Sequence, residues 1–438
     1  MTVHVIGAGL AGCEATWQLV NRNIPVILHE MRPKKSSAAH KTAYFGELVC
    51  SNSLRANNIE NAVGLLKEEM RRLNSLVIAT ADKHQVPAGG ALAVDREEFA
   101  KTLTDTIKKH PLVTVVEEEV VAFTFAPDDY VIVATGPLTS EALAEAIKKL
   151  VATDYFHFFD AAAPIVAADS INYDIVYKAS RYDKGEAAYL NCPFTEVQYK
   201  YFWQQLCAAQ DAPVKDFERG AVFEACMPIE EMARRGEETM RFGPLKPVGL
   251  PNPRTGQEAY AVVQLRQDNG AGSLYNIVGF QTHLKWPEQK RVFALIPGLE
   301  KAEFVRLGVM HKNSYINSPQ LLAADFSLRK NRHIYFAGQI TGVEGYVESS
   351  ASGLMAGINV ARALTKQDNI PFPAETAFGS LANYISNENI KDFQPMNINF
   401  GLMPAFKAEK RLKKREKNAL IAQRSLEKLE LFINNLLK

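Results

Sequence analysis

The first thirty residues combine a short apolar strand, a glycine-rich turn and a helix, and this order constrains the fold more than any other feature. The strand covers 3–6, a helix is expected over 13–20, and a second strand over 25–29 ends in the acidic residue Glu30. Between the first strand and the helix the chain reads Gly7-Ala8-Gly9-Leu10-Ala11-Gly12. Strand, glycine turn, helix, strand and acid together form the fingerprint of a dinucleotide-binding βαβ unit.

Each residue of this fingerprint has a physical role. Gly7 makes the tight turn, Gly9 lets the backbone approach a pyrophosphate, and Gly12 lets the helix pack close to the strand. The helix N-terminus offers N–H groups and a positive dipole end to phosphates. Glu30 lies where a carboxylate accepts hydrogen bonds from a ribose. We therefore predict a bound dinucleotide, and the alternative is a tight turn with no ligand.

Three separate segments favour FAD over NAD as this dinucleotide. The fingerprint begins within seven residues of the N-terminus, as is common where FAD is held permanently. An apolar strand expected over 130–134 closes in Ala-Thr-Gly, ending at Gly136. A third apolar strand leads to Gly338 and Gln339, and a helix is expected over 351–364. We predict that these segments converge on one cofactor site.

Composition limits the class of protein and its partners. A chain of 438 residues predicts two or three domains. The net charge of +1 means that any nucleic-acid surface is a local patch. There is no signal peptide and no apolar run long enough to span a membrane, so we expect a cytoplasmic protein. The five cysteines form no CxxC pair, which predicts a reduced protein without a bound metal.

The texture of the chain predicts an α/β fold with an insertion. Residues 1–154 and 305–438 are expected to form a discontinuous FAD-binding, Rossmann-like domain of the glutathione-reductase type. Residues 155–304 are richer in aromatic residues, prolines and short polar strands, and are expected to form an inserted α+β domain with a mixed sheet. Further elements of the first domain are expected at a helix over 62–73 and strands over 114–117 and 120–125.

The C-terminal segment 407–438 predicts a helix, because it lacks glycine and proline and is rich in Lys, Glu, Leu and Ala. Its basic residues are Lys407, Lys410, Arg411, Lys413, Lys414, Arg415 and Lys417. One interpretation is a surface helix docked by its apolar side with a solvated basic face. The other is a helix that contacts the phosphates of a nucleic acid.

Two of the five cysteines lie in polar, loop-like segments. Small capping residues follow Cys50, which predicts a helix N-terminus where a thiolate is favoured. Cys226 precedes Met-Pro-Ile-Glu and a basic pair at 234–235. A lone cysteine is more often a buried small apolar residue, and that interpretation is kept for the other three. The polar runs 239–250 and 263–269 predict a surface for a flat polar molecule such as a pterin or a nucleotide.

Several of these motifs together resemble one known family. They are the glycine fingerprint, Cys50-Ser51-Asn52-Ser53-Leu54, Phe223-Glu224-Ala225-Cys226-Met227-Pro228-Ile229-Glu230, the run 241–250, and Gly338-Gln339-Ile340-Thr341-Gly342-Val343-Glu344-Gly345-Tyr346. Over essentially its whole length the chain resembles the folate- and FAD-dependent tRNA (uracil-5-)-methyltransferases, the TrmFO family. The glycine fingerprint is shared by many flavoproteins, whereas the two cysteine segments and the run 241–250 are far more specific.

The resemblance implies an activity, cofactors and catalytic residues. FAD is reduced by NADH or NADPH, 5,10-methylenetetrahydrofolate supplies the one-carbon unit, and C5 of a T-loop uridine in the T-arm of tRNA becomes methylated. Both Cys226 and Cys50 match catalytic positions of the family. We expect Cys226 to attack C6 of the uracil, and Cys50 to act on the flavin side, as a base or as a transient partner of the one-carbon unit. Tyr346 is expected either to stack on the flavin ring or only to pack.

Other functions remain open at this stage. One is the larger GidA family, which installs carboxymethylaminomethyl groups on wobble uridine and carries an extra helical domain. A flavin-binding scaffold that docks on RNA without chemistry is another, and an ordinary flavoprotein reductase is a third. The sequence leaves open the oligomeric state, the choice between NADH and NADPH, and the orientation of the tRNA.

Overall fold

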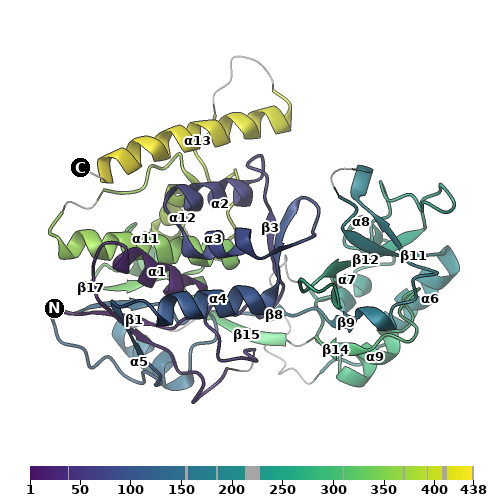
Figure 1. The fold of residues 1–438 in the computed structure, drawn as a ribbon, viewed down its shortest axis with the longest axis horizontal. Coiled ribbons are helices and arrows are strands. Elements are labelled where there is room, and N and C mark those ends of the chain that lie inside the picture. Colours follow the sequence, from purple (N-terminus) through teal and green to yellow (C-terminus); the bar gives the residue numbers. More distant parts are fainter. Residues whose placement is uncertain are drawn as a thin grey trace.

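The structure is a computed structural model of the chain, shown in Figure 1. It describes residues 1–37, 39–152, 156–183, 186–212, 227–308, 310–367, 370–391, 393–406 and 412–436. In 156–161 and 310–312 it describes only the backbone. Cys226 and the basic residues Lys407, Lys410 and Arg411 lie outside the described residues.

The first sheet has the parallel order that the fingerprint predicts. Its strands run in the order β16-β17-β7-β1-β2-β6. They are β1 (Val3–Ile6), β2 (Val26–His29), β6 (Val113–Val116), β7 (Tyr130–Val133), β16 (Ser327–Leu328) and β17 (Asn331–Phe336). All neighbours pair in parallel except β16, which is antiparallel to β17. The predicted α/β class with a parallel sheet is confirmed, and the apolar runs of β1 and β7 are buried as parallel strands require.

Helices pack on this sheet and bring distant parts of the chain together. Helix α1 (Leu10–Val20) follows β1, and α11 (Tyr346–Leu364) follows β17. The two helices can approach closely because Gly353 has no side chain. A Cβ at this position would lie only 2.1 Å from the Ala11 carbonyl oxygen. The remaining helices of this part are α2 (Ala62–Arg72), α3 (Leu76–Lys83), α4 (Arg96–Lys108), α5 (Glu141–Val151), α10 (Ser318–Leu321), α12 (Ala377–Ser386) and α13 (Lys414–Leu436).

A second sheet lies beside the first, at the right of Figure 1. Its order is β10-β11-β12-β13-β9-β14. The strands are β9 (Ile165–Ala167), β10 (Tyr177–Ala179), β11 (Tyr189–Phe194), β12 (Ala261–Gln267), β13 (Leu274–Ile277) and β14 (Phe304–Arg306). Every neighbouring pair is antiparallel, so the expected mixed sheet is wrong. Antiparallel pairing allows strands that follow each other in the chain, such as β12 and β13, to be joined by a short connection.

Among the described residues, four helices accompany the second sheet, and they enclose a separate apolar core with it. They are α6 (Glu196–Cys207), α7 (Ile229–Arg234), α8 (Thr239–Phe242) and α9 (Trp286–Phe293). An antiparallel pair, β8 (Phe156–Ala161) and β15 (Met310–Tyr315), carries the chain to and from this part. A small sheet of β3 (Ser53–Ala56), β5 (Ala91–Val94) and β4 (Gln85–Val86) completes the fold.

One expected strand does not form. Residues 120–125 have irregular backbone, although Phe123 and Phe125 pack against the core. The Phe125 ring lies 4.6 Å from the ring of His4 on β1. The apolar residues that suggested a strand therefore cover rings of the first sheet without joining its ladder. Among the described residues, no helix has both the length and the apolar character needed to cross a bilayer.

Candidate functional site

A cavity opens at the carboxyl ends of β1, β2, β7 and β17. Parallel α/β sheets bind their ligands at this edge. Nine of the predicted cofactor residues line it: Gly7, Gly9, Leu10, Ala11, Glu30, Gly136, Gly338, Gln339 and Tyr346. The three separate segments thus reach one cavity. The other two predicted residues, Ala8 and Gly12, are buried and do not line it.

The glycines of the turn differ in the space around them. A Cβ on Gly12 would lie 1.8 Å from the carbonyl oxygen of Gly7, so helix and turn touch there. A Cβ on Gly9 would meet nothing within 4 Å, because this position faces the cavity. Gly9 is also the N-cap of α1 and has no side chain to cap it. The N-terminus of α1 is therefore open to an anionic ligand such as a pyrophosphate.

Glu30 is a buried carboxylate held by its neighbours. Its Oε2 accepts a hydrogen bond from the backbone N–H of Ala8 at 2.8 Å. Its Oε1 accepts one from Nε of Arg32 at 2.9 Å. Burial acts to raise the pKa of Glu30, but hydrogen bonds and charge from Arg32 outweigh it and lower the pKa overall. Glu30 is thus ionised and fixed at the cavity wall, and Arg32 is a supporting residue that the sequence analysis missed.

Cys50 lies next to Tyr346, which lines this cavity. The hydroxyl oxygen of Tyr346 accepts hydrogen bonds from the backbone N–H groups of Cys50 and Ser51, at 2.6 and 3.1 Å. Cys50 leads into strand β3, so the predicted helix N-terminus at this cysteine is wrong. The small residues that follow it make side-chain contacts instead of capping a helix. Tyr346 is the first residue of α11, and burial raises its pKa, so its hydroxyl stays neutral.

Three arginines from different elements hold the segment around Cys50. Arg96 of α4 donates to the carbonyl of Leu48 at 2.5 Å and pairs with Asp268. Arg306 of β14 donates to the carbonyl of Val49.

Arg266 of β12 donates to Ser51 Oγ at 2.7 Å and to Asn52 Oδ1 at 3.1 Å. The polar run 263–269 therefore includes Arg266, which forms hydrogen bonds from the second sheet to the two residues after Cys50. No local pattern links these arginines with Cys50, and the sequence analysis did not select Arg96 or Arg306.

The other cysteines differ in their surroundings. Cys13 and Cys192 are fully buried, and burial raises the pKa of both thiols, which keeps them protonated. Cys207 is half-buried on α6. Cys226 lies outside the described residues, but its neighbour Met227 is buried.

Helix α13 has a buried apolar face and an exposed basic end, as its sequence predicts. Ile421, Leu429 and Phe432 are buried against the first core. Residues 413–417 are exposed. Arg415 of this basic face donates to Glu60 at 2.5 Å, so part of its charge is already neutralised.

A parallel Rossmann-type sheet and a cavity reached by three separate segments define a flavoprotein of the FAD-binding class. The family model described as "Glucose inhibited division protein A" matches residues 2–368. The chain is 61% identical to the "Methylenetetrahydrofolate--tRNA-(uracil-5-)-methyltransferase TrmFO" of Listeria welshimeri, and 60% identical to that of Lactobacillus acidophilus; each alignment covers 98% of both chains. The TrmFO of Halalkalibacterium halodurans is 57% identical over 99% of both. The chain belongs to the TrmFO family, which confirms the resemblance.

A solved structure supports the fold. The chain superposes on GidA of Aquifex aeolicus with a TM-score of 0.69 and 14% sequence identity. The match covers 98% of this chain and 73% of the other. At this identity the likeness shows the fold alone.

Proposed function

We propose that this protein methylates C5 of a T-loop uridine in tRNA, with 5,10-methylenetetrahydrofolate as one-carbon donor, FAD as cofactor and NADH or NADPH as reductant. The observation that carries the proposal is the full-length match, at 57–61% identity, to relatives named for this reaction. The cavity agrees with it, because the residues that a dinucleotide needs are present and point to one place.

The residues of the cavity fit FAD. The open N-terminus of α1 at Gly9 would hold the pyrophosphate, and the ionised Glu30 would face the ribose. Tyr346, which lines the cavity, would lie against the flavin ring. FAD when bound supplies the reducing equivalents that turn a one-carbon unit into a methyl group.

The chain's own residues would activate the uridine. C5 of uracil is a poor nucleophile until a group adds to C6, and a thiolate suits this step because it adds and is later eliminated. We assign the attack on C6 to Cys226. We assign the flavin-side role to Cys50, whose backbone is fixed by Tyr346 next to the cavity. A base must also remove the C5 proton, and Cys50 is the candidate.

The two sheets suggest how the substrates are brought together. We propose residues 1–154 and 305–438 as the FAD-binding domain and residues 155–304 as the inserted domain that carries Cys226. We further propose that the exposed basic residues of α13 contact the phosphates of the tRNA T-arm. Both assignments rest on the arrangement of the sheets and on the exposure of residues 413–417.

The decisive experiment is an assay with undermodified tRNA, 5,10-methylenetetrahydrofolate and reduced nicotinamide, which measures ribothymidine and follows labelled carbon from folate into RNA. Ribothymidine that depends on all three reactants is the expected result. RNA binding without methyl incorporation would point to a scaffold, and nicotinamide oxidation that needs no tRNA would point to a reductase. Modification of the wobble uridine instead would indicate a GidA-type activity.

A further inference from the structure

Three arginines meet at the segment around Cys50, and in the described part of the chain they have one carboxylate partner between them. They are Arg96 of α4, Arg266 of β12 and Arg306 of β14. Nη2 of Arg96 lies 2.9 Å from Oδ1 of the buried Asp268. Arg266 and Arg306 donate to oxygens that carry no charge, and within the described residues neither forms an ion pair. Three positive charges thus share one negative charge, which leaves two positive charges in excess.

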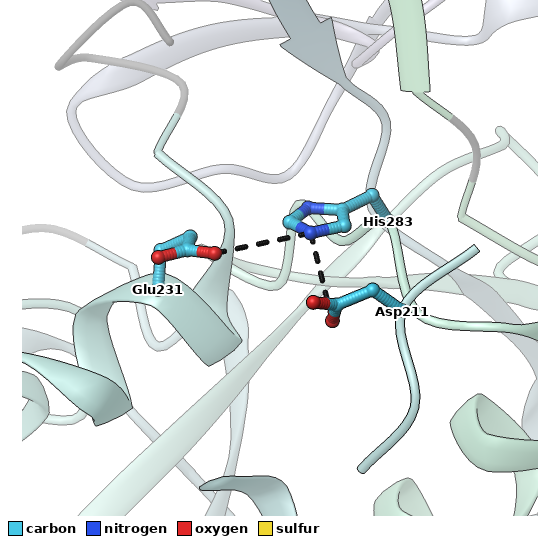
Figure 2. A group of neighbouring side chains, drawn as sticks. All are labelled: Asp211, Glu231 and His283. Carbon is cyan, nitrogen blue, oxygen red and sulfur yellow. Dashed lines mark ion pairs between the residues drawn. The ribbon is translucent and has the colours of Figure 1, made fainter. Parts of the chain in front are cut away.

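Another charged cluster of the second part has a different balance. Figure 2 shows His283 beside Asp211 and Glu231, a spacing that also suits a metal ion. Arg234 donates to Asp211 and to Glu231, each at 2.9 Å, so its guanidinium supplies positive charge to both acids, and we assign no metal to them. Each cation of that cluster faces an acid. The arginines at Cys50 differ because two of them face none among the described residues.

The excess charge lies where water screens it poorly. Arg266 is buried, and Arg96 and Arg306 are half-buried. Burial, followed by the charge of Arg96, lowers the pKa of Arg306, and burial also lowers the pKa of Arg266. Guanidinium groups nevertheless stay charged in proteins. The buried Nε atoms of Arg96 and Arg306 also have no hydrogen-bond partner among the described residues. Such a cluster favours an anion beside it.

Two of the arginines are fixed to the backbone directly before Cys50. Arg96 donates to the carbonyl of Leu48, and Arg306 donates to the carbonyl of Val49. The Val49 carbonyl belongs to the peptide bond that leads into Cys50. Covalent geometry therefore places the nearest nitrogen of Arg306 no more than about 9 Å from the sulfur of Cys50.

The other groups at this segment do not cancel the excess. Burial, followed by charge on Cys50, raises the pKa of Tyr346, so the hydroxyl beside Cys50 stays neutral. Burial acts to lower the pKa of Arg96 and Arg306, whereas negative charge on Asp268 and Cys50 acts to raise both. The charged and titratable groups reach this segment from α4, the end of β12, β14 and α11, as Arg96, Arg266, Asp268, Arg306 and Tyr346.

We propose that Arg96 and Arg306 are positioning residues that hold Cys50 as a thiolate, the anion that balances this cluster. They take the role that the sequence assigned to a helix N-terminus. The inference rests on the proposed function only for the use of the thiolate, which is the form of Cys50 that can accept the C5 proton while the electron pair of the C–H bond stays on the uracil. The ionisation itself can be measured without tRNA or folate.

The test titrates Cys50 in the flavin-loaded protein. Iodoacetamide alkylates the thiolate, and mass spectrometry follows the peptide that contains Cys50, with the half-buried Cys207 as internal reference. The thiolate absorbance of wild type minus that of Cys50→Ala gives the midpoint independently of reagent access. Wild-type Cys50 should titrate below the ordinary value of about 8.5. Arg306→Gln keeps a donor for the Val49 carbonyl but removes the charge, and its midpoint should lie about one pH unit higher than that of wild type.

Asp268→Asn tests the sign of the effect. It removes the one negative charge, so the midpoint of Cys50 should fall below that of wild type. A segment that is merely loosened would shift in the same direction in both variants. Arg306→Lys keeps the charge and should stay near wild type. Arg254→Gln is the matched control, because Arg254 also donates to backbone carbonyls, those of Tyr173 and Val176.

Four results overturn the proposal. They are a wild-type midpoint at or above about 8.5, an Arg306→Gln midpoint equal to that of wild type, equal directions of shift for Arg306→Gln and Asp268→Asn, and a shift in Arg306→Lys or Arg254→Gln as large as that in Arg306→Gln. If wild type forms no ribothymidine, the proposed function fails, and the titration still decides whether the arginines hold a thiolate.

Discussion

Replacing Gly9 should separate cofactor binding from folding. A Cβ at Gly9 meets nothing within 4 Å and the residue has a φ of −73°, so Gly9→Leu introduces neither a clash nor backbone strain. Leucine is a poor N-cap, and the apoprotein should lose about 1 kcal/mol of stability or less. The side chain points into the cavity where a pyrophosphate would lie at the N-terminus of α1. We expect FAD to bind at least about a hundredfold more weakly, which is roughly 2.7 kcal/mol.

Gly12→Leu is the matched control, because it adds the same side chain three residues further along. Its Cβ would lie 1.8 Å from the carbonyl oxygen of Gly7, which is backbone and cannot rotate away. Overpacking of this kind costs about 1–3 kcal/mol or more, so Gly12→Leu should unfold at a lower temperature even without FAD. Flavin absorbance of the purified proteins and thermal unfolding of both apoproteins measure the two effects. A Gly9→Leu protein that keeps wild-type FAD affinity, or whose apoprotein unfolds with Gly12→Leu, would refute the reasoning.

Three further predictions concern single contacts. Tyr346→Phe leaves two backbone N–H groups unpaired, so the unfolding free energy should fall by about 1–3 kcal/mol in denaturant titrations. Replacing Lys413 and Lys414 with Ala should weaken tRNA binding and reduce the slope of log K against log salt by about 1.8, and an unchanged slope would restore a solvated face. Burial raises the pKa of Glu69 to about 7, from 4.5, so the folded state keeps a proton that the unfolded chain releases. Stability should therefore fall as the pH rises from 4.5 through 7, and Glu69→Gln should reduce this fall in thermal unfolding.

The parts of the site that were predictable are those encoded in contiguous residues. The fingerprint from Gly7 to Gly12 specifies strand, turn and helix locally, and the parallel sheet follows from it. Gly136 and Gly338 were found in the same way, because each follows an apolar strand whose carboxyl end must reach the same edge of the sheet.

The supporting contacts could not be predicted, because they join residues far apart in the chain. Arg306 donates to the carbonyl of Val49, beside Cys50, across 257 positions of the sequence, and no local sequence pattern links the two segments. The helix expected after Cys50 failed for a related reason. Small polar residues cap helices in isolation, but here Ser51 and Asn52 find a partner in Arg266, and the chain extends as β3.

Cys226 should form a covalent bond to C6 of the target uridine, and Cys50 should be unable to replace it. The reason is chemical, since C5 must be activated by addition at C6, and Cys13 and Cys192 are buried with raised pKa values. In RNA that carries 5-fluorouridine, fluorine cannot leave C5 as a cation, so after one-carbon transfer the protein and RNA should remain joined. Wild type should give a slow-migrating band on a denaturing gel, with the link on the peptide that contains Cys226. Cys226→Ala should give neither band nor ribothymidine while it keeps its flavin, whereas Cys50→Ala should lose turnover at a different step. A cross-link that maps to Cys50, or that survives in Cys226→Ala, would require the two roles to be exchanged or abandoned.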